Sequence, residues 1–409
     1  MKELLKTYTH RFQVKAPYFS SHPRRELGLI IAIPSFKEPD ILPTLRSLAS
    51  CDRPKGSVEL IITINASDGS EPALLEANEN TFQQINSWRI TEKPDFMEVL
   101  VIREEHLPKK HAGAGWARKI GMDEAFRRWA MLEKDGPILC LDADCTVSKN
   151  YLTAAEAVFN DPDIDLGHFE FEHLHENEQD ESLKKGIVQY ELHLRCYVQG
   201  LQWAGYPFAV HTVGSCMAVR ASAYARAGGM NRRKAGEDFY FMHKLLPVSN
   251  FRYLGAIVYP SCRVSDRVPF GTGRAQLEWK ANEGERLSYD PRVYKLLKIL
   301  FDKVPEWYEN EVDVKGFPEV MQLFLDIIKL PGEVEKMKAQ SRSRVVFMRR
   351  FWQWMDGFMV LKFTHFLRDQ AFPNLPVFLA ARDLLDQILA SDPCFSVDSR
   401  LVKLVSCQE

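Results

Sequence analysis

The sequence predicts an α/β fold with a mostly parallel, doubly wound sheet and a helical C-terminal extension. Between residues 27 and 141, short and almost continuously apolar segments alternate with segments of helical spacing, a pattern typical of parallel sheets covered on both faces. From about residue 277 onward the spacing is mostly helical. We expect four parts: an N-terminal segment over 1–26, two halves of the sheet domain over 27–150 and 151–276, and a helical region over 277–409.

Each element has a local signal. Apolar runs predict strands over 27–34, 58–64, 97–102 and 137–141, and the segments between them have helical spacing, one with Pro72 in its first turn. The segment 166–176 alternates apolar and polar residues, which predicts a half-exposed strand. Further helices are expected over 180–198, 221–229 and 236–246, with a strand over 214–220.

Composition is that of an ordinary soluble protein. The chain has 409 residues, of which 45% are hydrophobic and 26% charged, and its net charge of -2 gives no whole-chain attraction to nucleic acid. The eight cysteines form no C-x-x-C pair, which is typical of reduced thiols in a cytosolic protein. The first residues contain no apolar core of signal-peptide length. We therefore expect a cytoplasmic protein without a nucleic-acid partner.

Two apolar segments bear on membrane contact. Residues 197–219 contain no Asp, Glu, Lys or Arg and are long enough to span a bilayer, but their Gln, Gly and Pro residues predict a helix end, a loop and a buried strand instead. Residues 344–368 carry two apolar rows flanked by basic side chains. A buried helix packed on the sheet domain is the favoured interpretation, and an interfacial helix touching the inner face of a membrane is the alternative.

Two carboxylates directly follow the fourth expected strand. In "GPILCLDADC", Asp142 and Asp144 are separated only by Ala143. Ligands of open parallel sheets bind beyond the carboxyl ends of the strands, and extended residues two apart point to the same side. Such a pair suits a hard divalent cation, Mn²⁺ or Mg²⁺. The alternative is structural, with Asp144 capping the following helix and Asp142 closing a turn.

Five motifs, in order over about residues 27–274, resemble family 2 glycosyltransferases, which have the GT-A fold. The matching residues are Pro34, Ser35, Phe36 and Glu38; Asn65, Asp68 and Gly69; Gly113 or Gly115 with Ala117, Arg118 and Gly121; Asp142 and Asp144; Glu237 and Asp238. The resemblance implies a metal-dependent, inverting transfer of a sugar from a UDP- or GDP-sugar to a hydroxyl acceptor, such as a glycan or a lipid-linked glycan. The setting would be glycan, polysaccharide or glycolipid biosynthesis.

The resemblance also implies residue roles. Asp238, beside Glu237, would accept the proton of the acceptor hydroxyl, although two carboxylates at a helix start are also favoured by the helix dipole alone. Asp144 would hold the metal, and Asp142 would share it or bind the ribose. The expected donor contacts are Pro34, Ser35, Glu38, Asn65, Asp68, Lys110, His111, Gly115, Arg118 and Asp142. The family's second strand usually ends in Asp, so base contact here would fall to Asn65 or Asp68.

Two further segments are candidates. "SCRVSDRVPFGTGRA" offers Arg263, Arg267, Gly273 and Arg274 for a lid over the donor or for an anionic acceptor, against the alternative of a solvated loop. His168, His173 and His175 could form a metal cluster, but a polar strand face bordering the acceptor is the favoured interpretation. Two other functions are alternatives: a nucleotide- or glycan-binding protein without turnover, and a sugar-phosphate nucleotidyltransferase. The latter needs a glycine-rich loop after the first strand, which "IPSFKEPD" lacks.

Overall fold

The computed structural model describes residues 1–12, 15–109, 112–231, 236–267, 270–282 and 284–406. The chain forms two compact units. The first comprises Met1–Gln179 and Thr212–Glu278, and the second comprises Asp180–His211 and Trp279–Glu409. The chain therefore leaves the first unit once and returns to it.

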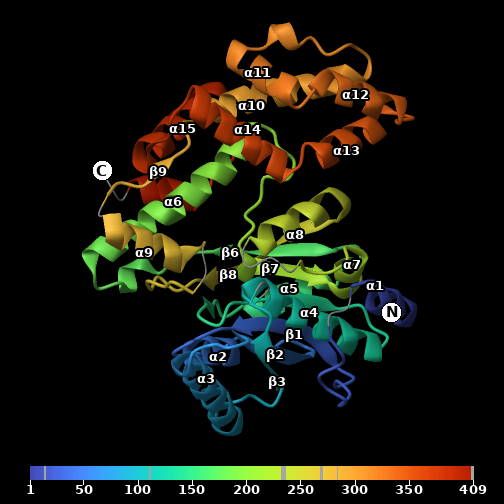
Figure 1. Ribbon diagram of the computed structural model, residues 1–409, viewed down its shortest axis with the longest axis vertical. Helices are drawn as coiled ribbons and strands as arrows, with labels where there is room; N and C mark the ends of the chain where they lie inside the picture. Colours follow the sequence, from blue (N-terminus) through green and yellow to red (C-terminus); the bar gives the residue numbers. More distant parts are fainter. Residues whose placement is uncertain (13–14, 110–111, 232–235, 268–269, 283, 407–409) are drawn as a thin grey trace. The chain divides into compact units, whose positions relative to one another are not determined.

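The first unit is built on a mixed, mostly parallel sheet (Figure 1). Its strand order in the described residues is β3-β2-β1-β4-β7-β6-β8-β5. The first four strands in this order, β3, β2, β1 and β4, are parallel to one another, and β6 is parallel to β8. Strand β7 is antiparallel to both β4 and β6. The strands are β1 Leu27–Ser35, β2 Ser57–Ser67, β3 Met97–Leu107, β4 Pro137–Cys140, β5 Thr146–Val147, β6 Leu166–Phe171, β7 Met217–Arg220 and β8 Phe251–Tyr259. The predicted α/β architecture is confirmed.

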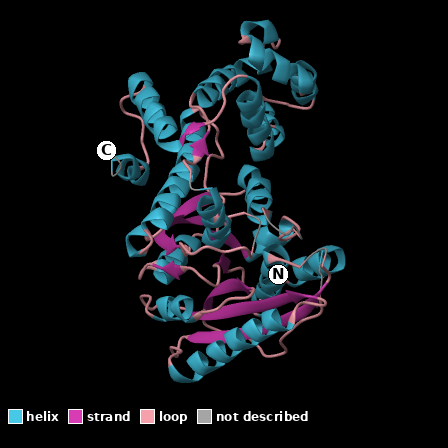
Figure 2. Ribbon diagram, turned by 60° about the vertical axis from the view of Figure 1, so that its left-hand side comes forward, coloured by secondary structure: helices cyan, strands magenta, loops and turns pink. Residues whose placement is uncertain are grey.

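Helices pack around these strands (Figure 2). The helix α4 lies against β1 and β2, and its indole at Trp129 donates a hydrogen bond of 3.2 Å to the carbonyl of Pro137, where β4 begins. The helices of this unit are α1 Lys2–Phe12, α2 Leu42–Ala49, α3 Pro72–Thr91, α4 Ala114–Met131, α5 Tyr151–Phe159, α7 Ala221–Arg226 and α8 Glu237–Leu245, with the short η1 His175–Asn177, η2 Gly214–Cys216 and η3 Leu246–Val248. Helix α9, Thr272–Asn282, leads into the second unit.

Strand β4 sets the position of the paired aspartates. It lies between β1, to which it is parallel, and β7, to which it is antiparallel. All four of its residues are buried, because both of its edges are hydrogen-bonded within the interior of the sheet. The residues after Cys140 therefore emerge in the middle of the sheet edge, between the two halves of the unit, where side chains from either half can meet.

Strand β6 is more buried than its alternating pattern predicts. Only Glu170 is exposed, and His168 is buried. The reason is that β6 is an interior strand between β7 and β8. Beyond it, His173 is buried with its Nε2 3.0 Å from the hydroxyl of Thr272.

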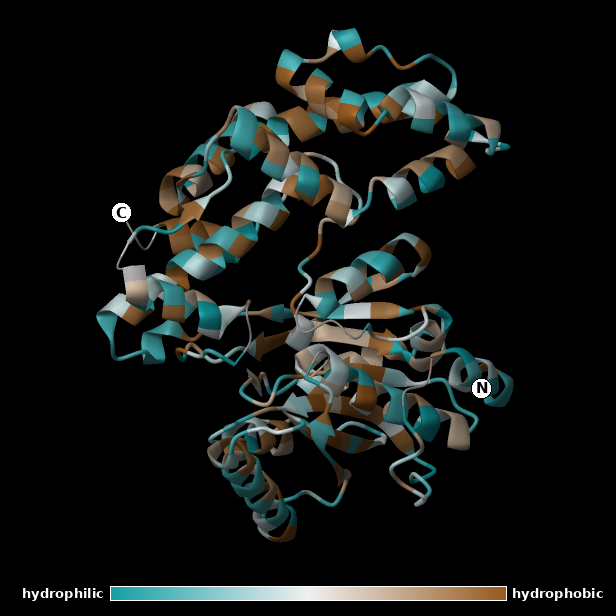
Figure 3. Ribbon diagram, viewed as in Figure 1, coloured by the Kyte–Doolittle hydropathy of each residue, from teal (hydrophilic) through white to brown (hydrophobic). Residues whose placement is uncertain are grey.

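The second unit is helical. It contains α6 Glu181–Trp203, α10 Arg292–Lys303, α11 Glu319–Ile327, α12 Leu330–Ala339, α13 Arg344–Trp354, α14 Gly357–Gln370, α15 Val377–Ser391 and α16 Ser399–Ser406, with η4 Val304–Tyr308, η5 Val314–Gly316 and the strand pair β9 Leu287–Ser288 and β10 Leu375–Pro376. In Figure 3 these helices carry both hydrophobic and hydrophilic residues, as amphipathic helices do.

The segment 344–368 is two helices rather than one. Helix α13 ends at Trp354, and Asp356 begins α14 by accepting a hydrogen bond of 2.8 Å from the backbone N–H of Met359. Side chains from both helices, including Phe351 and Phe363, lie in the core of the second unit itself. Among the described residues, no helix combines the length and apolarity that crossing a bilayer requires. The segment 197–219 is, as expected, a helix end, a loop and a buried strand.

Candidate active site

A buried arginine lies at the centre of the sheet edge. Arg118, in the second turn of α4, is 3% exposed, and its Nη2 lies 2.6 Å from Oδ1 of Asp142. Its Nη1 forms an ion pair with Glu237 at the start of α8. Arg118 therefore joins a carboxylate that follows β4 to a carboxylate of α8, and it balances charges that would otherwise repel each other.

Glu237 and Asp238 occupy the first turn of α8, where the helix dipole favours negative charge. The carboxylate of Glu237 is buried in its ion pair, whereas Asp238 keeps part of its surface exposed. Burial raises the pKa of Glu237 to about 7, against the lowering effect of Arg118. Burial likewise raises the pKa of Asp238, and Arg118 again opposes it. Both carboxyls thus have a raised pKa; that of Glu237 is held in an ion pair with Arg118, and that of Asp238 belongs to a partly exposed residue.

Gly214 completes this cluster, and the sequence reasoning missed it. A Cβ at this position would lie 2.9 Å from Oδ2 of Asp238 and 3.0 Å from both terminal nitrogens of Arg118. Only the absence of a side chain lets the two charged groups approach the backbone of η2 so closely. No local pattern marks this glycine, since the signal is its distance to residues far away in the sequence.

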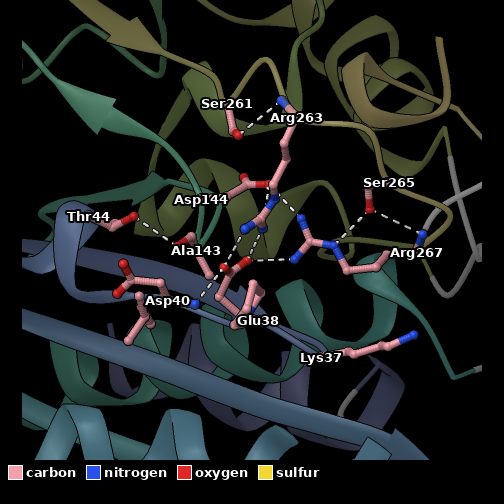
Figure 4. Close-up of polar contacts among 12 residues, drawn as sticks. Lys37, Glu38, Asp40, Thr44, Ala143, Asp144, Ser261, Arg263, Ser265 and Arg267 are labelled. Atoms are coloured by element: carbon pink, nitrogen blue, oxygen red, sulfur yellow. Dashed lines mark hydrogen bonds and ion pairs between the residues drawn. The ribbon is translucent and has the colours of Figure 1, made fainter. Parts of the chain in front are cut away.

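A second charged cluster surrounds Asp144 (Figure 4). Glu38, after β1, is fully buried and accepts hydrogen bonds from both Arg263 and Arg267. Nη1 of Arg263 lies 2.8 Å from Oε1 of Glu38, and Nη1 of Arg267 lies 2.6 Å from Oε2. The same arginines reach Oδ2 of Asp144, at 3.2 Å from Nη2 of Arg263 and 2.6 Å from Nη2 of Arg267. Two guanidinium groups thus bridge two carboxylates that follow different strands.

The loop after β8 holds these arginines in place. Ser265 accepts a hydrogen bond of 2.9 Å from Nε of Arg267, and its backbone N–H donates to the carbonyl of Gly273 at 3.1 Å. A Cβ at Gly273 would lie 2.5 Å from Cβ of Ser265, so this closure requires glycine. Gly273 therefore shapes the loop, while Arg274 points elsewhere and forms an ion pair of 2.9 Å with Glu278.

The other predicted donor residues are spread along the same edge. Pro34 and Ser35 are buried at the end of β1, and Asn65 is buried with its amide donating 2.8 Å to the carbonyl of Ser35. Asp68 has a side chain 77% exposed and lies 3.6 Å from His106. Gly115 is buried in the first turn of α4. Lys110 and His111 lie outside the described residues.

The arrangement does not present a metal site as it stands. No three His, Cys, Asp or Glu side chains within the described ranges are grouped so that they could hold a metal ion. Asp142 and Asp144 do not converge, because one is paired with Arg118 and the other with Arg263 and Arg267. A cation at Asp144 would share its ligand with two positive groups, which repel it.

One family of known sequences matches the chain. Residues 137–281 match the family described as "Glycosyl transferase family group 2". The match begins at β4 and includes the paired aspartates, Glu237 and Asp238, and the arginine loop. Most members of the two charged clusters therefore lie inside the match. Glu38 and Arg118 precede it in the sequence. No curated protein sequence matches the chain.

Solved structures of distant proteins are also similar. TarS 1–349 from S. aureus in complex with UDP-GlcNAc is 14% identical, with a TM-score of 0.41 over 80% of this chain and 91% of that one. A crystal structure of S. aureus TarS is 16% identical, with a TM-score of 0.39 over 72% of this chain and 50% of that one. TarS 1–349 with UDP is 15% identical, with a TM-score of 0.38 over 69% and 78%.

Proposed function

We propose that this chain, whose residues 137–281 match the family described as "Glycosyl transferase family group 2", is a glycosyltransferase that moves a sugar from a nucleotide-diphospho-sugar to a hydroxyl acceptor with inversion at the anomeric carbon. The observation that carries the proposal is the placement of Asp238. It is a partly exposed residue whose carboxyl has a raised pKa, and it interacts electrostatically with Arg118, which is ion-paired with Asp142 after β4. A base for the acceptor thus lies beside a carboxylate positioned for the donor.

The proposed reaction is a single displacement. Asp238 accepts the proton of the acceptor hydroxyl while that oxygen forms its bond to the anomeric carbon, and the bond from that carbon to the diphosphate oxygen breaks. Glu237 is the less suitable base because its carboxylate is already held by Arg118. Its role is to fix Arg118, which in turn orients Asp142 toward the donor.

The leaving diphosphate carries negative charge that the site has to stabilise. Arg263 and Arg267 are guanidinium groups on a loop at the same edge of the first unit, and guanidinium binds phosphate oxygens in a bidentate manner. We therefore place the diphosphate beside Asp144 and this loop. The donor contacts proposed from the sequence (Pro34, Ser35, Glu38, Asn65, Asp68, Lys110, His111, Gly115, Arg118 and Asp142) and the lid roles of Gly273 and Arg274 remain part of the proposal.

A divalent metal, Mn²⁺ or Mg²⁺, also remains a proposal, with Asp144 as its ligand. When bound, such an ion supplies positive charge to a diphosphate. The present pairing of Asp144 with two arginines does not fit that role, so none of the steps above depends on it.

The proposed acceptor is a hydroxyl of a glycan or a lipid-linked glycan. A cytoplasmic location with peripheral membrane contact through residues 344–368 is proposed as well.

The test is thermal stabilisation by a panel of nucleotide sugars, each with and without Mn²⁺, followed by turnover. A ligand that binds only the native state raises the melting temperature. We expect one UDP- or GDP-sugar to stabilise the protein and to be consumed when acceptor extracts are added. If no nucleotide sugar stabilises the protein under either condition, the proposed donor class is wrong. Stabilisation without consumption of any donor would favour a binding protein without turnover.

A further inference from the structure

The four charged groups around Asp144 form a closed, electrically balanced set. Glu38 and Asp144 contribute two negative charges, and Arg263 and Arg267 contribute two positive charges. Glu38 is fully buried, so its charge depends on these two partners. Of the two carboxylates, Asp144, with a side chain 24% exposed, is the one that a ligand entering from solvent can reach.

The two ends of this bridge differ in how firmly they are held. Arg267 uses Nη1 for Glu38 and Nη2 for Asp144, so it can release the second carboxylate while keeping the first. Arg263 contacts Glu38 with both terminal nitrogens but reaches Asp144 only with Nη2, at 3.2 Å. Glu38 therefore anchors the arginines, and Asp144 is the exchangeable partner.

A divalent cation and these arginines compete for the same oxygen. Oδ2 of Asp144 receives hydrogen bonds from both guanidinium groups, and a cation placed there would meet two like charges. A diphosphate changes this balance because it offers the arginines phosphate oxygens in place of the carboxylate. It also brings negative charge to which a cation can bind.

We propose that Arg263 and Arg267 are positioning residues that block cation binding at Asp144 until the diphosphate of the donor draws them away. The inference rests on the proposed function, because it takes the donor to contain a diphosphate. Cation and donor then bind cooperatively: each strengthens the binding of the other by the same factor. The cooperativity arises because Arg263 and Arg267 release Asp144, and the two aspartates alone do not produce it.

The test measures Mn²⁺ binding to the full-length protein. Binding is monitored through the loss of the electron paramagnetic resonance signal of free Mn²⁺. Wild type is compared with the variant R263Q/R267Q, each alone and with UDP or, in parallel, GDP. We expect the variant to bind Mn²⁺ without nucleotide at least tenfold more tightly than wild type. We expect UDP or GDP to tighten Mn²⁺ binding at least tenfold in wild type and much less in the variant.

Arg252→Gln is the matched control. It removes one positive charge from β8, the strand that leads into the loop, and Arg252 has its hydrogen bond with the carbonyl of Phe251 rather than with Asp144. Its Mn²⁺ binding should equal that of wild type. The proposal is overturned if wild type binds Mn²⁺ without nucleotide as tightly as R263Q/R267Q does. It is also overturned if Arg252→Gln tightens Mn²⁺ binding as much as the double variant.

The double variant leaves Glu38 buried without its partners, so a second measurement covers a failure to fold. In EDTA, UDP and GDP binding is measured by calorimetry for wild type, Asp144→Asn and Asp40→Asn. The inference predicts at least threefold tighter binding by Asp144→Asn, because its arginines are released for the diphosphate. Asp40, near Glu38, provides the control for loss of charge alone and should change binding less. Equal affinity of wild type and Asp144→Asn would overturn the inference.

The two proposals fail separately. If neither UDP nor GDP binds to any form, the donor class of the proposed function is wrong, while the Mn²⁺ comparison without nucleotide still decides whether the arginines block Asp144. If a nucleotide binds but wild type and R263Q/R267Q bind Mn²⁺ alike, the glycosyltransferase proposal stands and the arginine block is wrong.

Discussion

Gly214→Ala tests whether the packing around Arg118 matters for catalysis. The new methyl group would lie 2.9 Å from Oδ2 of Asp238 and 3.0 Å from the terminal nitrogens of Arg118, whereas ordinary Cβ contacts begin at 3.4 Å. The carboxylate of Asp238 and the guanidinium of Arg118 therefore have to move, and we expect the guanidinium to do so by lengthening its ion pairs. The contact that sets the scale is the one of 2.6 Å between Arg118 and Asp142.

The magnitude follows from the change in Coulomb energy. Lengthening this contact by about 0.5–1 Å weakens it by about 1–2 kcal/mol at an effective dielectric constant of about 20. If this loss appears in the transition state, kcat falls by about 5- to 30-fold. Because the substitution adds only one methyl group, we expect the protein to fold and to bind its nucleotide.

The assay is kcat for donor consumption with the donor selected by the stabilisation panel, together with the melting temperature. Gly332→Ala is the control, since a Cβ at Gly332 in α12 meets open space. A soluble Gly214→Ala enzyme with kcat within twofold of wild type would refute the reasoning, because it would show that the spacing of Arg118 and Asp238 is not needed for turnover.

Three further predictions concern the base, the arginine loop and residues 344–368. Because a base must be ionised and burial raises the pKa of Asp238 above its ordinary value of 3.8, against the lowering effect of Arg118, the acidic limb of kcat should lie above that value; an acidic limb at or below pH 3.8 would contradict this shift. Gly273→Ala forces Ser265 away and displaces Arg267, so it should raise the KM for the donor several-fold while Gly332→Ala leaves KM unchanged. If residues 344–368 touch membranes, removal of the exposed apolar side chain in Val345→Ser should reduce cosedimentation with anionic liposomes at low salt; no sedimentation of wild type would exclude this contact.

Much of the first unit can be predicted from its sequence. The strands β1, β2 and β4 are apolar runs because they are buried within the sheet, and such runs are visible in a single sequence. Polar motifs after these strands therefore mark the ligand edge. The position of Asp142 near Glu237 and Asp238 follows from that rule together with the family resemblance.

The pairing of these residues could not be predicted. Glu38 and Arg263 are separated by 225 positions in the sequence, and no local pattern indicates that one will bury its charge against the other. Likewise, the resemblance predicts that Arg118 contacts the donor, while in the structure it joins Asp142 to Glu237. The break between α13 and α14 was missed because apolar spacing continues through it, and only the capping of α14 by Asp356 ends the helix.

The most direct test of the central claim is turnover by Asp238→Asn. The amide has nearly the shape of the carboxylate but cannot accept the proton of the acceptor hydroxyl. We predict that the affinity for the donor, measured by calorimetry, stays within about threefold of wild type, and that kcat falls by about 10² or more. If Asp238→Asn binds its donor and turns it over at the rate of wild type, Asp238 is not the base and the proposed mechanism is wrong.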